Sequence, residues 1–458
     1  MFLDEISRLA KITKSIVREK TVKIFSHYDA DGIISASILS KMFIREGINF
    51  QLRILKQLTK EFVDEIVVNK NDFLIFTDFG SGQINILKKF FDITQVLIID
   101  HHQPINFHHI NLFHLNPILF NDEEVPSSII SYLFAKFFDK RNIDLVDLAV
   151  VGAIADEHEN DLEMKSFTKK VFDEAEAIGK LSITKGLRFY GRNRPIHKSL
   201  ALSFDPFIPD ISGSESQAVQ FLSEINIPIL NGSEVRTLKD LTLEEQQRLA
   251  SAIISERMKL EENVEDIFGN IYTLIGKPEE IQDAREFGTL INACGRTGNF
   301  LVAFKLCLGE YSSLEECFEI LDKYRKMISD ALNLLKEEKE IVIETDYAKF
   351  IFGETKIPDT IIGTITSIII NSNLFGLEKP IFGFADTTNN MVKVSARAPK
   401  IMENLNLGNI LRKAAQYVNG EAGGHIKAAG ALIPKENQEK FIHIINTLLG
   451  EAFGDKKG

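Results

Sequence analysis

Residues 21–32, TVKIFSHYDADG, join an apolar run to an acidic turn. The apolar run 21–27 has the composition of a buried strand, and the stretch 33–47 that follows the acidic turn has helical spacing. A strand followed at once by a helix is the repeating unit of a parallel sheet, because the helix carries the chain back to the start of the next strand. We therefore predict a parallel sheet that begins here.

The same alternation continues to about residue 100. Strands are predicted at NFQLRIL (49–55), FLIFTDF (73–79) and VLIID (96–100), with helices at 58–68 and 84–92. This pattern predicts an α/β protein whose mainly parallel sheet is covered on both faces. A second, smaller α/β module with a hairpin is predicted after residue 341.

The length of 458 residues predicts two or three domains. We expect a first domain at 1–310 with a helical insertion at roughly 200–285, a connecting helix at 311–341, and a second α/β domain at 342–458. Residues 186–216 contain many turn-forming residues and predict an irregular, exposed connection.

The composition is that of a globular protein, with 44% hydrophobic residues and a formal net charge of −12. Bulk charge of this sign does not attract nucleic acid, so such contact needs a local basic surface or bound metal ions.

Three cysteines without Cys-x-x-Cys spacing predict neither a zinc site nor a disulfide framework. The chain also shows neither a secretory signal pattern nor a run of roughly 18 apolar residues. We therefore expect a cytoplasmic protein that does not enter the membrane.

Carboxylate and imidazole side chains stand at the ends of three predicted strands and of the later apolar run 148–156. They are, in chain order, His27, Asp29, Asp31, Asp78, Asp100, His101, His102 and Asp156. Because the carboxyl ends of parallel strands share one edge of a sheet, we expect these groups to meet in a single crevice.

Carboxylates gathered in one crevice repel one another unless cations neutralise them. Mixed carboxylate and imidazole donors suit Mn²⁺ or Mg²⁺ better than a thiolate-rich zinc site. Two such ions about 4 Å apart can activate water for attack on a phosphate ester, with one carboxylate shared between them. Asp78, on a central strand, is the candidate for the shared ligand. Taken alone, Asp31 could cap a helix and Asp78 could occupy a turn, so the prediction rests on their joint placement.

Four segments, SHYDADG, TDFGSG, IIDHH and GAIAD, resemble in this order the four motifs of the Asp-His-His (DHH) phosphoesterases. The resemblance implies two Mn²⁺ ions, with Mg²⁺ as the alternative. It assigns one ion to Asp31, Asp78, His101 and Asp156, and the other to His27, Asp29 and Asp78. It also implies that Asp100 orients His101 through a ring nitrogen and that His102 faces the scissile phosphate as a donor.

A glycine-rich segment, GGHIKAAG at 423–430, resembles the signature of the substrate-binding DHHA1 domain that follows the catalytic domain in this superfamily. Paired glycines let backbone amides approach an anion, although GGH alone is typical of any helix–strand connection. VSARAP at 394–399 resembles a second substrate-contacting strand of that domain, and its arginine suits phosphate binding. The resemblance implies substrate contacts from Ser395, Arg397, Gly424 and His425.

The segment EFGTLINACGRTGN, residues 286–299, resembles the Asn-Ala-x-x-Arg segment of RecJ-type exonucleases. It implies that Arg296 meets a backbone phosphate and that Asn292 supports the loop, whereas the segment alone could be a helix that ends at Gly295. We therefore predict a divalent-metal-dependent exonuclease that acts on single-stranded DNA or RNA in replication or repair. At the level of the family, GINS and the replicative helicase complex are possible partners.

Two other functions stay open. One is a phosphodiesterase for very short oligonucleotides. The other is a replisome scaffold that binds GINS without hydrolysis. The complete set of ligand-type residues favours an enzyme.

His108, His109 and His114 lack a carboxylate at ligand spacing and predict packing or surface roles. The basic and aromatic segment 188–198 could guide a single strand or be a solvated loop.

Overall fold

The computed structural model describes residues 1–156, 166–204, 206–258, 267–372, 376, 378–388, 390–399, 401–402, 405–424 and 426–454. The chain forms two compact units. Unit 1 comprises Met1–Thr184 and Ile271–Asp322, and unit 2 comprises Lys185–Asn270 and Lys323–Gly458. The boundaries fall inside the paired strands β6 (Leu181–Leu187) and β9 (Phe268–Leu274) and inside helix α13 (Leu314–Glu337).

Unit 1 is built on a five-stranded sheet with the order β2-β1-β3-β4-β5. Every neighbouring pair in this sheet is parallel, which confirms the predicted α/β class and parallel sheet. The strands are β1 (Thr21–His27), β2 (Phe50–Leu55), β3 (Asp72–Thr77), β4 (Val96–Ile99) and β5 (Leu112–Leu115). All six residues of the central strand β3 are buried, as expected of a strand covered on both faces.

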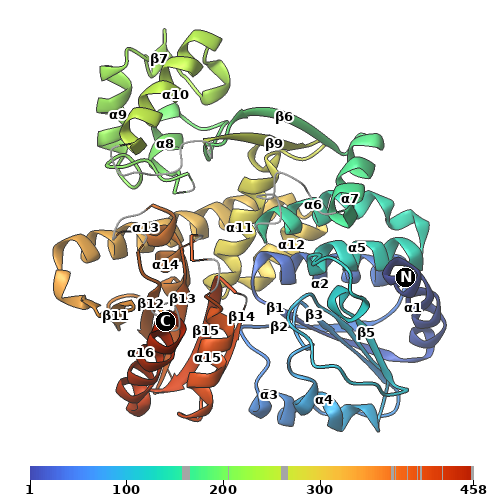
Figure 1. Ribbon diagram of the computed structural model, residues 1–458. Coiled ribbons are helices and arrows are strands. Elements are labelled where there is room, and N and C mark those ends of the chain that lie inside the picture. The colour runs from blue at the N-terminus through green and yellow to red at the C-terminus, as the bar shows by residue number, and fades with distance from the viewer. Residues whose placement is uncertain are drawn as a thin grey trace. The chain divides into compact units, whose positions relative to one another are not determined.

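Helices cover both faces of this sheet (Figure 1). Figure 1 shows α3 and α4 on the side of the sheet opposite to α2 and α5. The helices of unit 1 are α1 (Phe2–Ile16), α2 (Ala30–Arg45), α3 (Lys60–Glu65), α4 (Ile84–Phe91), α5 (Ser127–Phe138), α6 (Val146–Ala155), α7 (Ser166–Ala177), α11 (Ala284–Arg296), α12 (Phe300–Leu308) and the first part of α13. On the side of α4, a core of large apolar residues such as Phe76, Leu87 and Phe91 fixes the helix to the sheet.

The structure adds one strand, β5, to the four predicted for the sheet of unit 1. β5 contains His114, so it lacks the uninterrupted apolar run of β4. The helix predicted at 311–341 is shorter than expected: α13 covers Leu314–Glu337. A single turn of 3₁₀ helix flanks it on each side.

Unit 2 contains a six-stranded mixed sheet with the order β10-β11-β12-β13-β15-β14. Its strands are β10 (Val342–Glu344), β11 (Lys349–Glu354), β12 (Ile381–Asp386), β13 (Met391–Arg397), β14 (Glu421–Gly424) and β15 (Ala428–Pro434). β12 and β13 pair antiparallel, which agrees with the predicted hairpin, although Asn389 of its turn lies outside the described residues.

Helices α14 (Ile362–Asn371), α15 (Leu407–Gln416) and α16 (Gln438–Gly454) pack on this sheet. Val394 and Ala396 of β13 point into the core shared with α15 and α16. Side chains alternate along a strand, so Ser395 and Arg397 face the other side, where α14 lies. The second α/β module predicted from the sequence is therefore present.

Residues 185–270 of unit 2 differ from the expectation for 186–216. This stretch holds α8 (Ile196–Ala201), α9 (Glu215–Glu224), α10 (Leu243–Met258) and the short paired strands β7 (Leu230–Asn231) and β8 (Glu234–Val235). Phe189, Ile196, Leu200 and Ile208 are buried in its hydrophobic core. The prediction of an exposed connection was wrong, because the turn-forming residues separate short apolar segments that pack together.

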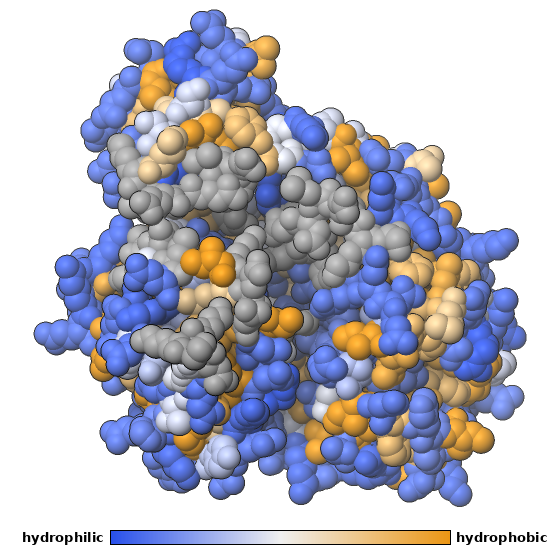
Figure 2. All heavy atoms as spheres, in the orientation of Figure 1, coloured by the Kyte–Doolittle hydropathy of each residue, from blue (hydrophilic) through white to orange (hydrophobic). Residues whose placement is uncertain are grey.

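The surface agrees with the globular composition. Hydrophilic side chains cover most of the face seen in Figure 2, with hydrophobic ones in small groups. No helix in the described part of the chain is both long and apolar enough to cross a membrane.

Candidate metal centre

The register of the sheet brings three strand ends to one level. Thr77 of β3 pairs with Ser26 of β1 on one side and with Ile99 of β4 on the other. The next residues, His27 at the end of β1, Asp78 after β3 and Asp100 after β4, therefore lie at the same edge of the sheet. This is the crevice that strand-end placement predicted.

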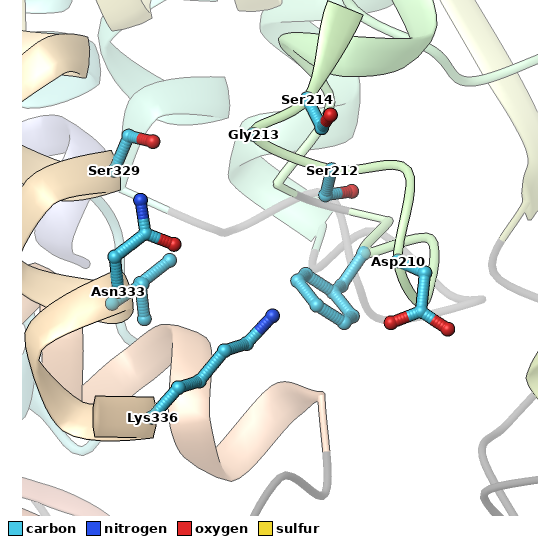
Figure 3. Close-up of a pocket in the computed structure, with 9 residues that line it drawn as sticks. Asp210, Ser212, Gly213, Ser214, Ser329, Asn333 and Lys336 are labelled. Carbon is cyan, nitrogen blue, oxygen red and sulfur yellow. The ribbon is translucent and has the colours of Figure 1, made fainter. Parts of the chain in front are cut away.

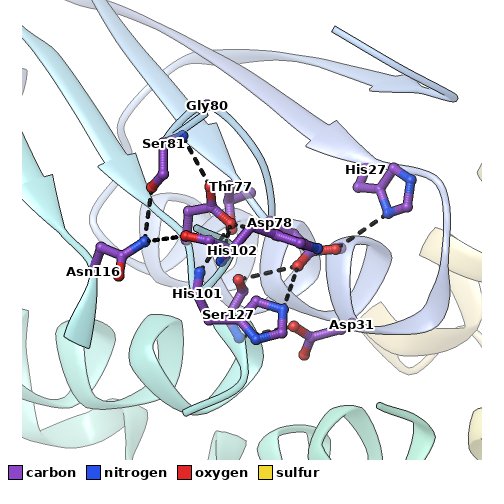
Figure 4. A network of polar contacts seen from close by, with 12 residues as sticks. His27, Asp31, Thr77, Asp78, Gly80, Ser81, His101, His102, Asn116 and Ser127 are labelled. Carbon is purple, nitrogen blue, oxygen red and sulfur yellow. Dashed lines mark hydrogen bonds and ion pairs between the residues drawn. The ribbon is translucent and has the colours of Figure 1, made fainter. Parts of the chain in front are cut away.

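Asp78 lies at the centre of this crevice (Figure 4). Its backbone is in the left-handed region, with φ of 64°, and its N–H donates to Ile99 O at 2.9 Å. Oδ1 accepts from Ser127 Oγ at 3.1 Å and lies 3.4 Å from His101 Nε2. Oδ2 is buried and lies 3.3 Å from His27 Nδ1 without the alignment of a hydrogen bond. Asp78 thus faces donor groups from two directions.

The turn after β1 places the next two groups. Asp29 is the N-cap of α2, and its Oδ1 accepts from Gly32 N at 3.0 Å. Its other oxygen, Oδ2, lies 2.8 Å from His27 Nδ1. One imidazole therefore stands between the carboxylates of Asp29 and Asp78.

Asp31 does cap a helix, but not its own. Its Oδ2 and Oδ1 accept from the backbone N–H groups of Ser127 and Ser128, at 2.8 and 2.9 Å, at the start of α5. Each carboxylate oxygen keeps a further lone pair, so these bonds orient Asp31 without excluding a second role as a ligand.

Asp100 contacts a different histidine from the one that the resemblance implied. Its Oδ1 accepts from His102 Nδ1 at 2.7 Å, and its Oδ2 accepts from Ser81 N at 2.9 Å. The predicted contact with the His101 ring was wrong, because the chain turns His102 back over the Asp100 carboxylate. His101 Nδ1 instead faces Glu124 Oε1 at 3.6 Å. The sequence did not single out Glu124.

A buried polar network supports the loop of His102 (Figure 4). Asn116 Nδ2 donates to His102 O at 2.8 Å and to Ser81 Oγ at 2.9 Å. Ser81 Oγ also contacts His114 Nε2 at 2.8 Å, and burial lowers the pKa of His114 to about 4. His114 therefore supports the loop as a neutral side chain, in line with the packing role predicted for it.

Three overlapping groups of side chains could each hold a metal ion, because their ligand atoms lie within 4.8 Å of one another. They are His27, Asp29 and Asp78; Asp31, His101 and Asp156; and Asp78, His101 and His102. Two of the groups share Asp78 and two share His101. The first group contains the same three residues that the DHH resemblance assigns to one ion.

The electrostatics of the crevice fit bound cations. Burial raises the pKa of Asp31 well above its usual range, and the charges of Asp78 and Asp156 raise it further. Burial opposes a charge on His27, but Asp29 and Asp78 outweigh burial and hold the pKa of His27 well above its usual value. A divalent cation supplies the positive charge that this group of carboxylates otherwise takes up as protons.

Helix α11 holds the turn after β1 in place. Asn292 Oδ1 accepts from Ala30 N at 2.8 Å. A Cβ added to Gly295 would lie 1.8 Å from Tyr28 O, so only glycine lets the helix approach this turn. The helix continues through Gly295 to Arg296, which is half-buried at its end. Asn292 thus contacts the turn after β1, and the phosphate contact that the resemblance implies for Arg296 stays a prediction.

In unit 2, Ser395 and Arg397 lie on β13 and Gly424 lies on β14, with β15 between the two strands. Arg397 Nη1 donates to Ser395 Oγ at 3.2 Å, and Arg397 Nε donates to Ser367 Oγ at 2.9 Å. Gly424 of β14 pairs with Ala429 of β15, the strand that also pairs with β13. His425 lies outside the described residues.

A cavity of about 70 Å³ in unit 2 contains none of the predicted site residues (Figure 3). Polar side chains that line it include Asp210, Ser212, Ser329, Asn333 and Lys336. The predicted metal-binding and substrate-binding residues therefore lie outside this cavity.

Three family models match this chain. The DHH family N-terminal domain matches residues 21–153, the DHH-CID domain matches residues 189–268, and the DHHA1 domain matches residues 352–451. The chain is 30% identical to an uncharacterized protein of Methanocaldococcus jannaschii, over 98% of this chain and 99% of that protein.

Two solved structures share the fold at low sequence identity. RecJ from Thermus thermophilus, in complex with Mn²⁺, has a TM-score of 0.60 at 17% identity over 98% of this chain. This chain spans about half of that RecJ, 55% of its length, and the same RecJ is also known in complex with Mg²⁺. CDC45 from Entamoeba histolytica has a TM-score of 0.63 at 15% identity, over 98% of this chain and 99% of that protein. The chain therefore belongs to the DHH family and has the RecJ-like fold of that superfamily.

Proposed function

We propose that this chain is a Mn²⁺- or Mg²⁺-dependent phosphodiesterase that removes nucleotides from an end of single-stranded DNA or RNA. The observation that carries the proposal is the gathering of His27, Asp29, Asp31, Asp78, His101 and Asp156 into overlapping groups at one edge of the sheet. A fold that served only as a scaffold would have no need to crowd buried carboxylates in this way.

The ligand assignment follows the contacts. Asp78 would be shared, because its two oxygens face His101 and His27 separately. His27 and Asp29 would complete one site, and Asp31, His101 and Asp156 the other. Bound divalent ions would supply activation of water and charge stabilisation at the phosphate.

His102 is the candidate proton donor to the leaving oxygen. Burial opposes a charge on His102, but the neighbouring Asp100 carboxylate outweighs burial and raises the pKa of His102 above its usual value. Because Nδ1 is bonded to Asp100, the ring presents Nε2 to the substrate. Asp100 thereby fixes both the orientation and the protonated state of the donor.

Substrate contacts are proposed from both units. Arg296 of unit 1 and Arg397 of unit 2 are suited to phosphate oxygens, and Ser395, Gly424 and His425 complete the set on unit 2. These local groups supply the attraction that a chain of net charge −12 does not provide in bulk.

The direct test is hydrolysis of end-labelled single strands by the full chain. We expect stepwise shortening of strands several tens of nucleotides long, of DNA or RNA, with Mn²⁺ or Mg²⁺ and none with chelator. Cleavage of a trinucleotide with no cleavage of the long strands would instead identify a short-oligonucleotide phosphodiesterase. No cleavage of either substrate with either ion would refute the enzyme proposal.

The fold shared with CDC45 favours a second candidate, a protein-binding role without hydrolysis, with GINS of the replicative helicase as the partner implied by the RecJ-like resemblance. It predicts a stable complex with GINS that forms equally well in chelator. An inactive chain that binds GINS would support this candidate, and an active chain that does not bind GINS would exclude it.

A further inference from the structure

The short segment 124–128 contacts several of the proposed metal ligands at once. At its C-terminal end, the start of α5 donates hydrogen bonds to Asp31 and Asp78. At its N-terminal end, Glu124 Oε1 lies 3.6 Å from Nδ1 of His101. Asp31, Asp78 and His101 are three of the four residues that the DHH resemblance assigns to one ion, the fourth being Asp156. The segment therefore lies next to the ligands of that ion.

We propose that Glu124 is a positioning residue for His101: its carboxylate holds the ring so that Nε2 faces the ligand carboxylates. This inference rests on the proposed function, because it concerns the same metal centre. It adds a residue that the family motifs do not include and that acts on one of the two ions.

The His101 ring presents its two nitrogens to different partners. Nε2 lies 3.4 Å from Asp78 Oδ1 and 3.6 Å from Asp156 Oδ2, so this nitrogen faces the other ligands. Nδ1 faces Glu124. The ring is only 2% exposed, and a buried imidazole that ligates through one nitrogen needs a partner for the N–H on the other.

The acid next to His101 in the sequence does not supply this partner. Both oxygens of Asp100 are engaged, Oδ1 with the ring of His102 and Oδ2 with Ser81 N. Among the residues that the structure describes, Glu124 is a carboxylate on the Nδ1 side of His101. Each of the two adjacent histidines therefore faces its own acid.

Glu124 is followed by two buried residues, while its own side chain is partly exposed. Val125 and Pro126 are buried, and Pro126 directly precedes α5. The Glu124 side chain is 33% exposed. The separation of 3.6 Å exceeds the roughly 2.7–3.2 Å of an N–H···O hydrogen bond, so a small rotation is needed to form one.

The test is Mn²⁺ binding by the full chain, measured by calorimetry for Glu124→Ala and Glu124→Gln. Glu123→Ala is the matched control, because it removes the same charge from an exposed neighbour. We expect two ions in the wild type and in the control. Glu124→Ala should weaken the binding of one ion about 10- to 100-fold and leave the affinity for the other ion unchanged. A loss of this size is usual when a ligating histidine loses its hydrogen-bond partner. Glu124→Gln should lose less, because its amide oxygen still accepts from Nδ1–H.

The outcomes separate this inference from the proposed function. If the wild type binds two ions and both Glu124 variants match Glu123→Ala, the inference is overturned and the metal centre stands. Equal weakening of both ions also overturns it, because a role at His101 is selective. A folded wild type that binds no Mn²⁺ overturns both. Circular dichroism checks folding, and Glu124→Gln carries the test if Glu124→Ala does not fold.

Discussion

The two groups of site residues are held by opposite physical means. In unit 1, charged side chains at the ends of β1, β3, β4 and α6 and at the start of α2 crowd into one crevice, where burial and then the charges of neighbouring carboxylates raise the pKa of Asp31. In unit 2, small residues and one arginine are placed by strand pairing: Arg397 is bonded to Ser395 and Ser367, and Gly424 pairs with Ala429. The first arrangement needs cations to offset its repulsion, and the second is complete from packing and hydrogen bonds alone.

Because the two sites are held differently, they should respond differently to the same perturbation. Metal removal should affect unit 1 and leave unit 2 unchanged, because no part of the contacts at Ser395, Arg397 or Gly424 depends on neutralising carboxylates. Substitutions at Gly424 should act through the fit of the backbone in the strand pair, so their effect should not depend on metal ions.

The largest effect is expected for Asp78→Asn. Asparagine tolerates the left-handed backbone at this position, so the change removes the shared charge and keeps the turn. Metal-dependent hydrolysis should fall by more than about 10³-fold, the upper end of the loss for a single electrostatic group. Hydrolysis rates with Mn²⁺ check this, with circular dichroism as the folding control. Activity within about tenfold of wild type would contradict the role of Asp78.

Two adjacent glycines of unit 2, Gly423 and Gly424, differ in the space around them. Gly424 has φ of 122°, and an added Cβ would lie 2.5 Å from Ala429 Cα, whereas a Cβ on Gly423 would meet nothing within 4 Å. Gly424→Ala should therefore cost about 2–4 kcal/mol of unfolding free energy, from backbone strain and overpacking. Denaturant unfolding measures the loss, and Gly423→Ala is the matched control. Equal stability of the two variants would contradict the requirement for glycine at position 424.

Metal addition tests the comparison directly. Ions that bind only the folded protein should stabilise unit 1 by about 2.7 kcal/mol at a concentration a hundredfold above the dissociation constant. Hydrogen exchange should slow in β3 and β4 when Mn²⁺ is added to the chelated protein, and should stay the same in β13 and β15. In the Asp78→Asn variant the slowing should disappear. Protection of β13 and β15 equal to that of β3 would break the distinction between the sites.

The smallest effect is expected for Arg397→Lys. The guanidinium fork spans Ser367 Oγ, Ser395 Oγ and the Ala396 carbonyl, and an ammonium group cannot reproduce these contacts. Single-strand binding should weaken about tenfold, which corresponds to about 1.4 kcal/mol, as a higher KM with kcat unchanged. Lys393→Arg on the same strand is a control that keeps the charge. A fall in kcat with KM unchanged would contradict a binding role.

The sequence predicted the parts of the site that depend on local pattern. Strand ends at His27, Asp78 and Asp100 follow from short apolar runs, and the parallel sheet brings the ends to one edge whatever the details of the loops. The strand β5 was not predicted, because four residues that include a histidine do not stand out from a loop.

Other parts of the site depend on contacts that no local pattern encodes. Asp100 precedes two histidines, and only the turn of the chain decides that its carboxylate meets His102. Glu124 lies in a polar loop that comes near His101 in the folded chain, next to the buried Val125 and Pro126. Residues 186–216 carry many turn formers, and their burial in unit 2 depends on apolar neighbours that are distant in sequence.

The bond between Asn292 and Ala30 joins residues 262 positions apart, and it has a consequence for synthesis. A chain leaves the ribosome from its N-terminus, so β1 and its acidic turn emerge long before α11 exists. Until Asn292 and Gly295 arrive, the turn lacks the support that holds Asp29 and Asp31 in place. The growing protein should therefore acquire its ability to capture metal late, when the segment 284–296 docks, and a fragment that stops before α11 should bind ions poorly even if its sheet has formed.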